Sequence, residues 1–433
     1  MSRRLAEYFT ETRRNAIVVW TLVCVLGGTL LGGAYLDRYE PVLFGVVAIV
    51  IVVTPPAKFR NPFAVAPWYF VGLLCLPVLW EAFVPIPIAT GIVSGLAVAT
   101  MGLLIAVELD RFTSLRLEPW FAVALTVLFT LAMAGLFGIL RWISDVLFGT
   151  TYLLDGRTQD AINAAVMIEF IYATIAGLVA GGLFYFYFRR RDRPAEPEAV
   201  LGPTRVDEQE DVEGVVLSDR LGVSVRRQRQ LARAMQLLLV ALFVYGLWSR
   251  QIAVVTNAAL AIAITFIPPV LERDYQVTIE PGLVLWMTAA VFLHALGTAG
   301  LYDVLSTWDH LTHTLSATVV AAAGYASLRA IHLHASGVYL PKWAMFGFLL
   351  VFMLAMSVIW EILEFFVDQG ALLFGMEPIL AQHGIDDTIV DMIFNLIGSI
   401  IVAAWGTVYL VELSETLARV LEEQFESPTR STR

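Results

Sequence analysis

Residues 342–368 read KWAMFGFLLVFMLAMSVIWEILEFFVD, a stretch long and apolar enough to cross a bilayer as one helix. Its last two turns nevertheless carry Glu361, Glu364 and Asp368, spaced by three and four residues along one helical face. Ionisable groups inside a membrane are costly unless they pair, reach water or hold an ion. The stretch therefore predicts both a membrane helix and a functional site on that helix.

The composition of the whole chain predicts an integral protein of the cell membrane. Hydrophobic residues make up 58% of the 433, charged residues only 15%, and the mean hydropathy is +0.74. Soluble domains carry about a quarter charged residues, so this composition excludes an ordinary soluble protein. The basic residues 1–14 run into an apolar span without a small-residue cleavage site, which predicts an anchor rather than a removed signal peptide. We expect membrane lipids as partners and no nucleic acid.

Hydropathy predicts an all-α, polytopic fold with about twelve transmembrane helices. They are expected near residues 15–36, 40–55, 66–85, 88–108, 118–147, 161–188, 231–249, 252–271, 282–301, 310–333, 342–368 and 387–412. The polar stretch 189–230, rich in Pro, Glu, Asp and Arg, predicts a flexible linker. The predicted domains are a six-helix half over 1–188, this linker, a second six-helix half over 231–413 and a polar tail over 414–433.

The distribution of basic residues predicts the orientation, with both termini in the cytoplasm. In this orientation only four of the 28 basic residues lie toward the outer side, namely Arg38, Arg141, Arg157 and Arg250. A wrong helix count would have mixed the basic residues of the inner side with those of the outer side, so the count and the orientation support each other.

Acidic residues outnumber basic ones, and few of the basic residues are lysine. The chain has 38 acidic residues, and Lys58 and Lys342 are its only lysines. This balance fits a protein adapted to a high-salt cytoplasm, where carboxylates keep proteins hydrated. The alternative is a GC-rich genome that favours arginine codons.

The two predicted halves resemble each other. The segment from Trp120 to Asp145 aligns without gaps on the segment from Trp343 to Asp368, and the end residues are identical. The pair Pro55-Pro56 likewise matches Pro268-Pro269, each near the end of a second helix. An even number of spans per half keeps both halves in one orientation, which predicts a pseudo-two-fold axis along the membrane normal.

The first copy lacks the acids of the second. Gly138 and Arg141 stand where the second copy has Glu361 and Glu364. Carboxylates that only held a helix end would be expected in both copies. The difference predicts one active half and one degenerate, supporting half.

Two further stretches bring acidic residues and histidines to the same predicted outer surface. They are residues 308–313, which read WDHLTH, and residues 386–391, which read DDTIVD. Each pair is four residues apart, as for neighbours on one helical face: Asp309 to His313, Asp387 to Asp391, and Asp391 to Asn395. We expect these faces and that of residues 361–368 to converge on one pocket open to the outer surface.

The expected pocket favours a divalent metal ion, of unknown identity. Gathered carboxylates repel each other, and burial penalises their charged forms, so a cation would relieve both problems. Oxygen ligands suit Mg²⁺, Ca²⁺ or Mn²⁺, whereas an added imidazole favours Zn²⁺, Mn²⁺ or iron. The predicted metal ligands are Asp309, His313, Glu361, Glu364, Asp387 and Asp391, and the predicted catalytic groups are Glu361, Glu364 and His313.

Structural roles are the alternative for several of these polar residues. Asp386 and Asp387 fit an acidic N-cap that complements the helix dipole. Asp368, near a helix end, and Asp303, in an outer loop, are expected to be solvated. His294 is expected to be a hydrogen-bonded histidine of the helix bundle.

The candidate site residues carry a resemblance to the YjdF-like bacterial inner-membrane proteins, a family with a domain of unknown function. That family has an aromatic-Asp-x-x-x-His motif, a Glu-x-x-Glu-aromatic motif and an Asp-Thr-x-x-Asp-Met motif. The corresponding segments here are WDHLTH at 308–313, EILEF at 361–365 and DTIVDM at 387–392. The resemblance covers about residues 231–413 and implies the same six ligands, but it brings no established reaction. The chain differs from the family pattern in three respects: it has Trp308 in place of Tyr, it lacks a second Trp before Asp391, and it has an extra N-terminal half.

Motifs that would name a reaction are absent from the sequence. There is no His-Glu-x-x-His, no Gly-x-Ser-x-Gly and no phosphate-binding Gly-x-x-x-x-Gly-Lys motif. The favoured interpretation is a metal-dependent hydrolase or transferase acting on a lipid or lipid-linked substrate at the outer leaflet. The alternatives are an ion- or proton-coupled transporter, whose site would usually lie near the bilayer midplane, and a structural membrane protein.

Overall fold

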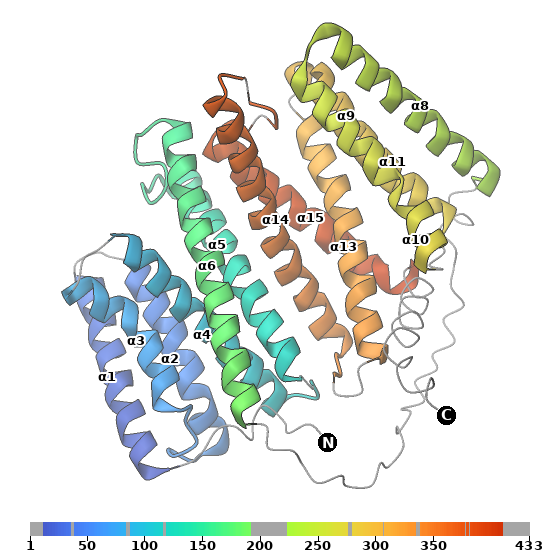
Figure 1. Cartoon of the computed structure of the whole chain (residues 1–433). Helices are drawn as coiled ribbons and strands as arrows, with labels where there is room; N and C mark the ends of the chain where they lie inside the picture. Colours follow the sequence, from blue (N-terminus) through green and yellow to red (C-terminus); the bar gives the residue numbers. More distant parts are fainter. Residues whose placement is uncertain are drawn as a thin grey trace, which may run out of the picture. The chain divides into compact units, whose positions relative to one another are not determined.

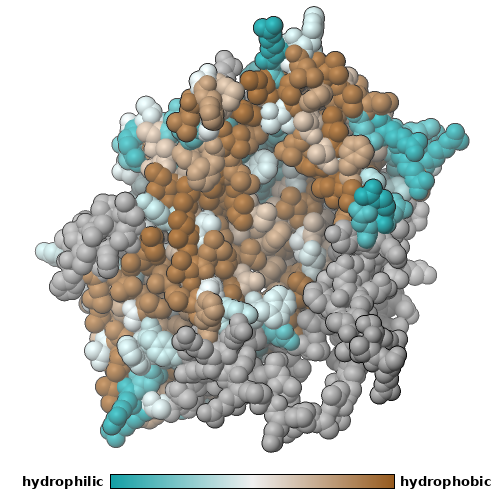
Figure 2. Space-filling view, viewed as in Figure 1, coloured by the Kyte–Doolittle hydropathy of each residue, from teal (hydrophilic) through white to brown (hydrophobic). Residues whose placement is uncertain are grey.

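A computed structural model describes residues 12–35, 39–83, 87–115, 118–191, 223–275, 279–305, 307–334, 338–376, 378–380 and 382–409. Helices make up its regular structure, and no β-sheet occurs among these residues. Ten of the described helices are long and apolar enough to cross a membrane, and two shorter apolar segments, Phe44–Phe59 and Trp68–Pro77, accompany them. Figure 2 shows a visible face that is largely hydrophobic. The chain is therefore an all-α, multi-pass membrane protein, as predicted, while the count of twelve spans and the orientation stay predictions.

The chain divides into two compact units, and the division passes through two helices, α5 (Pro119–Phe148) and α6 (Gln159–Arg191). The first unit holds α1 to α4, the beginning of α5 and the end of α6. The bounds of its first four helices are α1 Arg13–Tyr35, α2 Tyr39–Phe59, α3 Trp68–Phe83 and α4 Pro87–Phe112. α1 packs against α2 and α3, and α4 packs against α3 and α2.

Asn15 fastens the start of α1 to the connection between α2 and α3. Its side-chain amide donates to the carbonyl of Ala66 at 3.0 Å, and its oxygen accepts the N–H of Trp68 at 2.7 Å. Buried Val19, Leu26 and Leu74 continue the contact along the helices. One polar anchor and an apolar core thus hold this unit together.

The second unit holds the end of α5, the beginning of α6 and all the later helices. These helices are α8 Val225–Ser249, α9 Ile252–Thr265, α10 Ile267–Tyr275, α11 Pro281–Leu296, α12 Tyr302–Val304, α13 Trp308–His334, α14 Lys342–Leu373 and α15 Ile385–Tyr409, with a π-helical turn, η2, at Gly297–Leu301. α13, α14 and α15 pack against one another, and α11 connects this group to α8 and α9 (Figure 1).

Several helix limits differ from the predicted ones. α6 continues to Arg191 and α8 already begins at Val225, so both helices extend into the predicted linker, whose residues 192–222 lie outside the described residues. Arginine and glutamine are good helix formers, which explains why polar sequence continues an apolar helix. The predicted helix 252–271 is broken at Phe266, and Pro268-Pro269 fall in the first turn of α10, where proline is tolerated.

A glycine brings α13 and α15 into close approach. A Cβ at Gly398 would lie 2.6 Å from the carbonyl oxygen of Thr314 and 2.8 Å from the Cβ of Ala317. His310 of α13 also stacks on Phe394 of α15, with ring centroids 4.3 Å apart. The close approach carries the acidic beginnings of both helices toward each other.

Candidate metal centre

Three side chains from α13 and α15 converge on one point. The Nε2 atom of His313 lies 3.5 Å from Oδ1 of Asp309 and 3.5 Å from Oδ2 of Asp391. One ligand atom of each residue lies within 4.8 Å of the other two. Within the described parts of the chain, these three are the residues that meet the geometric requirement for a shared ion.

The distances fit a common ligand sphere. Two ligands about 2.1 Å from a tetrahedral ion lie about 3.4 Å from each other. Both contacts of His313 are close to that value. Asn395 lies one turn beyond Asp391 on the same face of α15.

The beginning of α13 is anchored to α11. The indole N–H of Trp308 donates to the carbonyl of Leu293 at 3.0 Å. Between these helices, the chain kinks at Gly300, and Tyr302 lies directly over Gly297, where a Cβ would overlap the tyrosine ring. The Tyr302 hydroxyl lies 2.7 Å from Nδ1 of His294 and 3.3 Å from Oγ1 of Thr312.

His294 is thus a hydrogen-bonded histidine of the bundle, as predicted. Its ring centroid lies 6.4 Å from that of His313, so it adjoins the three-residue group without belonging to it. Gly300 has a left-handed φ of +125°, so the chain kinks between α11 and α12. The kink places the Tyr302 hydroxyl beside His294 and Thr312.

A second polar group surrounds Glu361, which is 0% exposed. Its Oε2 accepts the side-chain N–H of Gln382 at 2.9 Å, and Oε1 of Gln382 accepts from Asn163 at 2.7 Å. The hydroxyl of Thr388 donates to Oδ1 of Asn163 at 3.1 Å. Side chains of α6, α14, α15 and the connection before α15 therefore form one chain of hydrogen bonds that ends at a carboxylate.

In this region, Glu361 and Asp391 each have one buried carboxylate oxygen without a hydrogen-bond partner among the described residues, Oε1 and Oδ1 respectively. Their carboxylates are close enough for the charges to interact. Glu364, one turn after Glu361, is buried as well. Unsatisfied buried acceptors are uncommon and costly, so each calls for an explanation such as a proton, a water or an ion.

Asp368 is not solvated, contrary to the prediction. It is buried, and its carboxylate accepts the backbone N–H groups of Ile379, Leu380 and Gln382 at 2.8, 2.7 and 3.0 Å. Sequence position suggested a helix end in water, but the following connection folds back over the carboxylate. Asp368 thus fixes the loop that presents Gln382 to Glu361.

Asp145 in the first copy aligns with Asp368, and its carboxylate also accepts hydrogen bonds from the connection that follows its helix. Its carboxylate accepts the N–H groups of Tyr152, Leu153 and Leu154 at 2.8, 2.6 and 2.8 Å, and the hydroxyl of Thr150 at 2.5 Å. The aligned aspartates therefore share a structural role. The duplication itself stays a prediction.

The acids at the start of α15 make structural contacts. Oδ2 of Asp387 accepts the N–H of His383 at 2.9 Å, in keeping with a cap. Asp386 is exposed and accepts from the Trp142 indole at 2.7 Å and from the Gln159 amide at 2.9 Å. Neither residue supplies an atom to the three-residue group, and neither do Glu361 and Glu364. Asp303 is exposed, as predicted.

The site is more enclosed than the predicted open pocket. His313, Asp391, Glu361 and Glu364 are buried, and Asp309 keeps 24% of its side chain exposed. Asp309 is the most accessible of these carboxylates.

Sequence reasoning missed Gln382 and Asn163. Gln382 lies in a connection with no periodic pattern, and nothing in one sequence pairs it with a residue 219 positions earlier. Asn163 carries a signal in the sequence, because an amide inside an apolar helix usually hydrogen bonds to a neighbouring helix.

Comparison with known protein families agrees that the chain is a membrane protein. A family described as a predicted membrane protein (DUF2238) matches residues 231–412, which confirms the YjdF-like resemblance over the C-terminal half. A domain of unknown function (DUF8268) matches residues 3–65. No curated protein and no solved structure matches the chain.

Proposed function

We propose that Asp309, His313 and Asp391 bind one divalent metal ion. The supporting observation is the placement of one ligand atom from each residue within 4.8 Å of the other two. An ion there would neutralise the carboxylates of Asp309 and Asp391, which face each other across His313. Two carboxylates and an imidazole favour Zn²⁺, Mn²⁺ or iron.

We further propose that the site is that of a hydrolase or transferase acting on a lipid or lipid-linked substrate. Three protein ligands leave a coordination position for water or substrate, as in catalytic zinc sites. The ion would activate that water or polarise a phosphoryl or carbonyl oxygen. Glu361 and Glu364 act as general base or additional ligands, and Asp387 stays a candidate ligand. Lipid contact along the apolar helices supports a lipidic substrate.

Lipid turnover tests the proposed reaction. The purified protein is incubated with a membrane lipid extract and Zn²⁺ or Mn²⁺, and the lipids are compared by mass spectrometry before and after. The proposal expects one lipid class to disappear with wild type and to persist with Asp391→Asn. The matched control is Asp386→Asn, an exposed neighbour that should keep the activity.

A coupled transporter gives a different outcome. Lipid composition would then stay unchanged with both proteins, and stability would respond to Na⁺ or pH instead of a divalent ion. That combination of results would overturn the enzymatic proposal.

A further inference from the structure

α8 has one face packed inside the protein and one face turned outward. Its buried positions are Gln228, Ala232, Leu239 and Gly246, on the side that packs against α9 and α11. The outward side carries large apolar residues whose exposed fractions reach 72% at Leu237 and 83% at Trp248. Such a stripe on a membrane-spanning helix is suited to lipid acyl chains.

Arginines continue this stripe at the start of the helix. Arg226, Arg229 and Arg233 are spaced by three and four residues, and the same spacing leads on to the exposed apolar positions Leu237, Val240 and Val244. Residues that advance by three or four positions lie on one side of a helix. The basic and apolar groups are therefore successive parts of one outward face.

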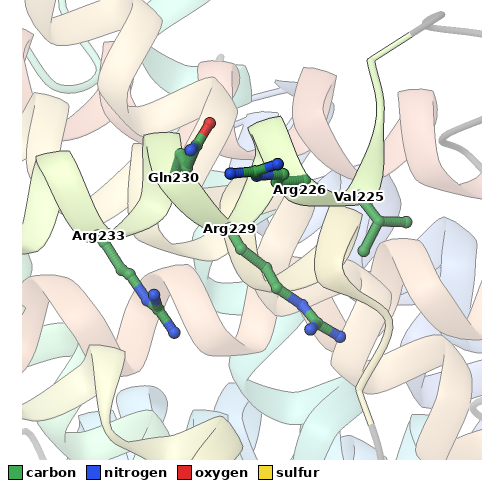
Figure 3. Close-up of a pocket in the computed structure, with 5 residues that line it drawn as sticks. All are labelled: Val225, Arg226, Arg229, Gln230 and Arg233. Atoms are coloured by element: carbon green, nitrogen blue, oxygen red, sulfur yellow. The ribbon is translucent and has the colours of Figure 1, made fainter.

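The arginines line a hollow of about 560 Å³, together with Val225 and Gln230. Figure 3 shows Arg229 and Arg233 extending in the same direction, while Arg226 extends toward Gln230. No ion pair joins these three arginines to another residue in the described part of the chain. The hollow thus offers guanidinium donors, which suit phosphate oxygens.

We propose that this hollow binds the phosphate headgroup of an anionic phospholipid whose acyl chains lie along the exposed stripe of α8. Charge complementarity selects an anionic group, and basic residues beside a membrane helix attract anionic lipids. The exposed apolar stripe favours a lipid over a soluble phosphate or an acidic peptide, because only a lipid has both a phosphate for the arginines and acyl chains for the stripe. The site lies on α8, separate from the carboxylates of α13 and α15.

Lipid competition in detergent tests the proposal with the full chain. The protein is titrated with phosphatidylglycerol and with phosphatidylcholine of identical acyl chains, and bound lipid is counted by native mass spectrometry. Wild type should prefer phosphatidylglycerol. Each arginine replaced by glutamine should weaken that preference about fivefold, and the triple variant R226Q/R229Q/R233Q should lose it.

Two control variants separate the site from general charge. Arg227 is exposed but does not line the hollow, and it lies about 100° around the helix from Arg226. Arg227→Gln should keep the preference, although it removes the same charge. The triple lysine variant should keep much of it, because the cationic charge remains.

Four results would overturn the proposal. The first is equal binding of both lipids by wild type, and the second is an equal loss in Arg227→Gln. The third is a preference that appears only after the acidic residues of segment 207–213 are neutralised, which would assign the hollow to the chain's own linker. Binding of glycerol phosphate as tightly as the whole lipid would likewise show a soluble-phosphate site and exclude a lipid site.

Discussion

The C-terminal ends of α5 and α14, with the connections that follow them, form two corners of the fold. The two corners share a hydrogen-bonding pattern but differ in the ionisable residues that precede it. At each corner a buried aspartate, Asp145 or Asp368, accepts three backbone N–H groups from the connection that follows. One and two turns before it, α14 has Glu364 and Glu361, whereas α5 has Arg141 and Gly138. Arg141 lies over the ring of Phe137, with 5.0 Å from guanidinium carbon to ring centroid.

The comparison separates structural acids from candidate functional ones. Asp145 and Asp368 have hydrogen-bond donors on both carboxylate oxygens, so the fold explains them fully. Glu361 has a donor on one oxygen only, and Asp391 likewise has an oxygen without a partner among the described residues. Acids that the fold leaves unsatisfied are the better candidates for binding an ion.

The largest expected effect is the loss of either corner aspartate. Asp368→Ala and Asp145→Ala should each destabilise the protein by several kcal/mol, because each hydrogen bond to a charged acceptor contributes about 1.5–3 kcal/mol. Thermal unfolding in detergent measures the effect, and exposed Asp303→Ala serves as control. A severe loss of stability in one variant and none in the other would contradict the shared structural role of Asp145 and Asp368.

A smaller effect is expected where α13 meets α15. Gly398→Ala should destabilise by about 1–3 kcal/mol through overpacking and should weaken metal binding, because it separates Asp391 from His313. The matched control is Gly347→Ala in α14, where a Cβ meets nothing within 4 Å. If Gly398→Ala melts like wild type and binds metal equally well, the close approach does not position the site.

The smallest effect is expected for Glu361→Gln, which removes a charge and little volume. Without metal the variant should be as stable as wild type or more stable by about 1 kcal/mol, because repulsion among the neighbouring carboxylates is relieved. Melting curves in the presence of a chelator give the measurement. A clear loss of stability would place Glu361 with the structural acids.

Much of the fold followed from the sequence, because apolar stretches about 20 residues long have few alternatives to membrane helices. Each predicted segment overlaps a described helix, although Phe266 interrupts one and polar arginines extend another. Helix ends depend on local propensities that hydropathy does not measure. The helical spacing of Asp309 and His313 likewise predicted their common face correctly.

The partners of these residues were harder to predict. One sequence does not show that the connection after α14 folds back on Asp368 or that Gln382 contacts Glu361, because such contacts depend on loop conformation. It also does not show which of six candidate ligands share one point. Of the six, Asp309, His313 and Asp391 place a ligand atom each within 4.8 Å of the other two, on two helices that approach closely at Gly398.

Direct measurement of bound metal tests the central claim. The purified chain is dialysed against Zn²⁺ or Mn²⁺ in detergent, and the ion content is determined by elemental analysis. We expect about one ion per chain in wild type and in Asp386→Asn, removal of that ion by a chelator, and no bound ion in the triple variant D309N/H313Q/D391N. A wild-type chain without bound ion, or a triple variant that binds as much as wild type, would contradict the proposed metal centre.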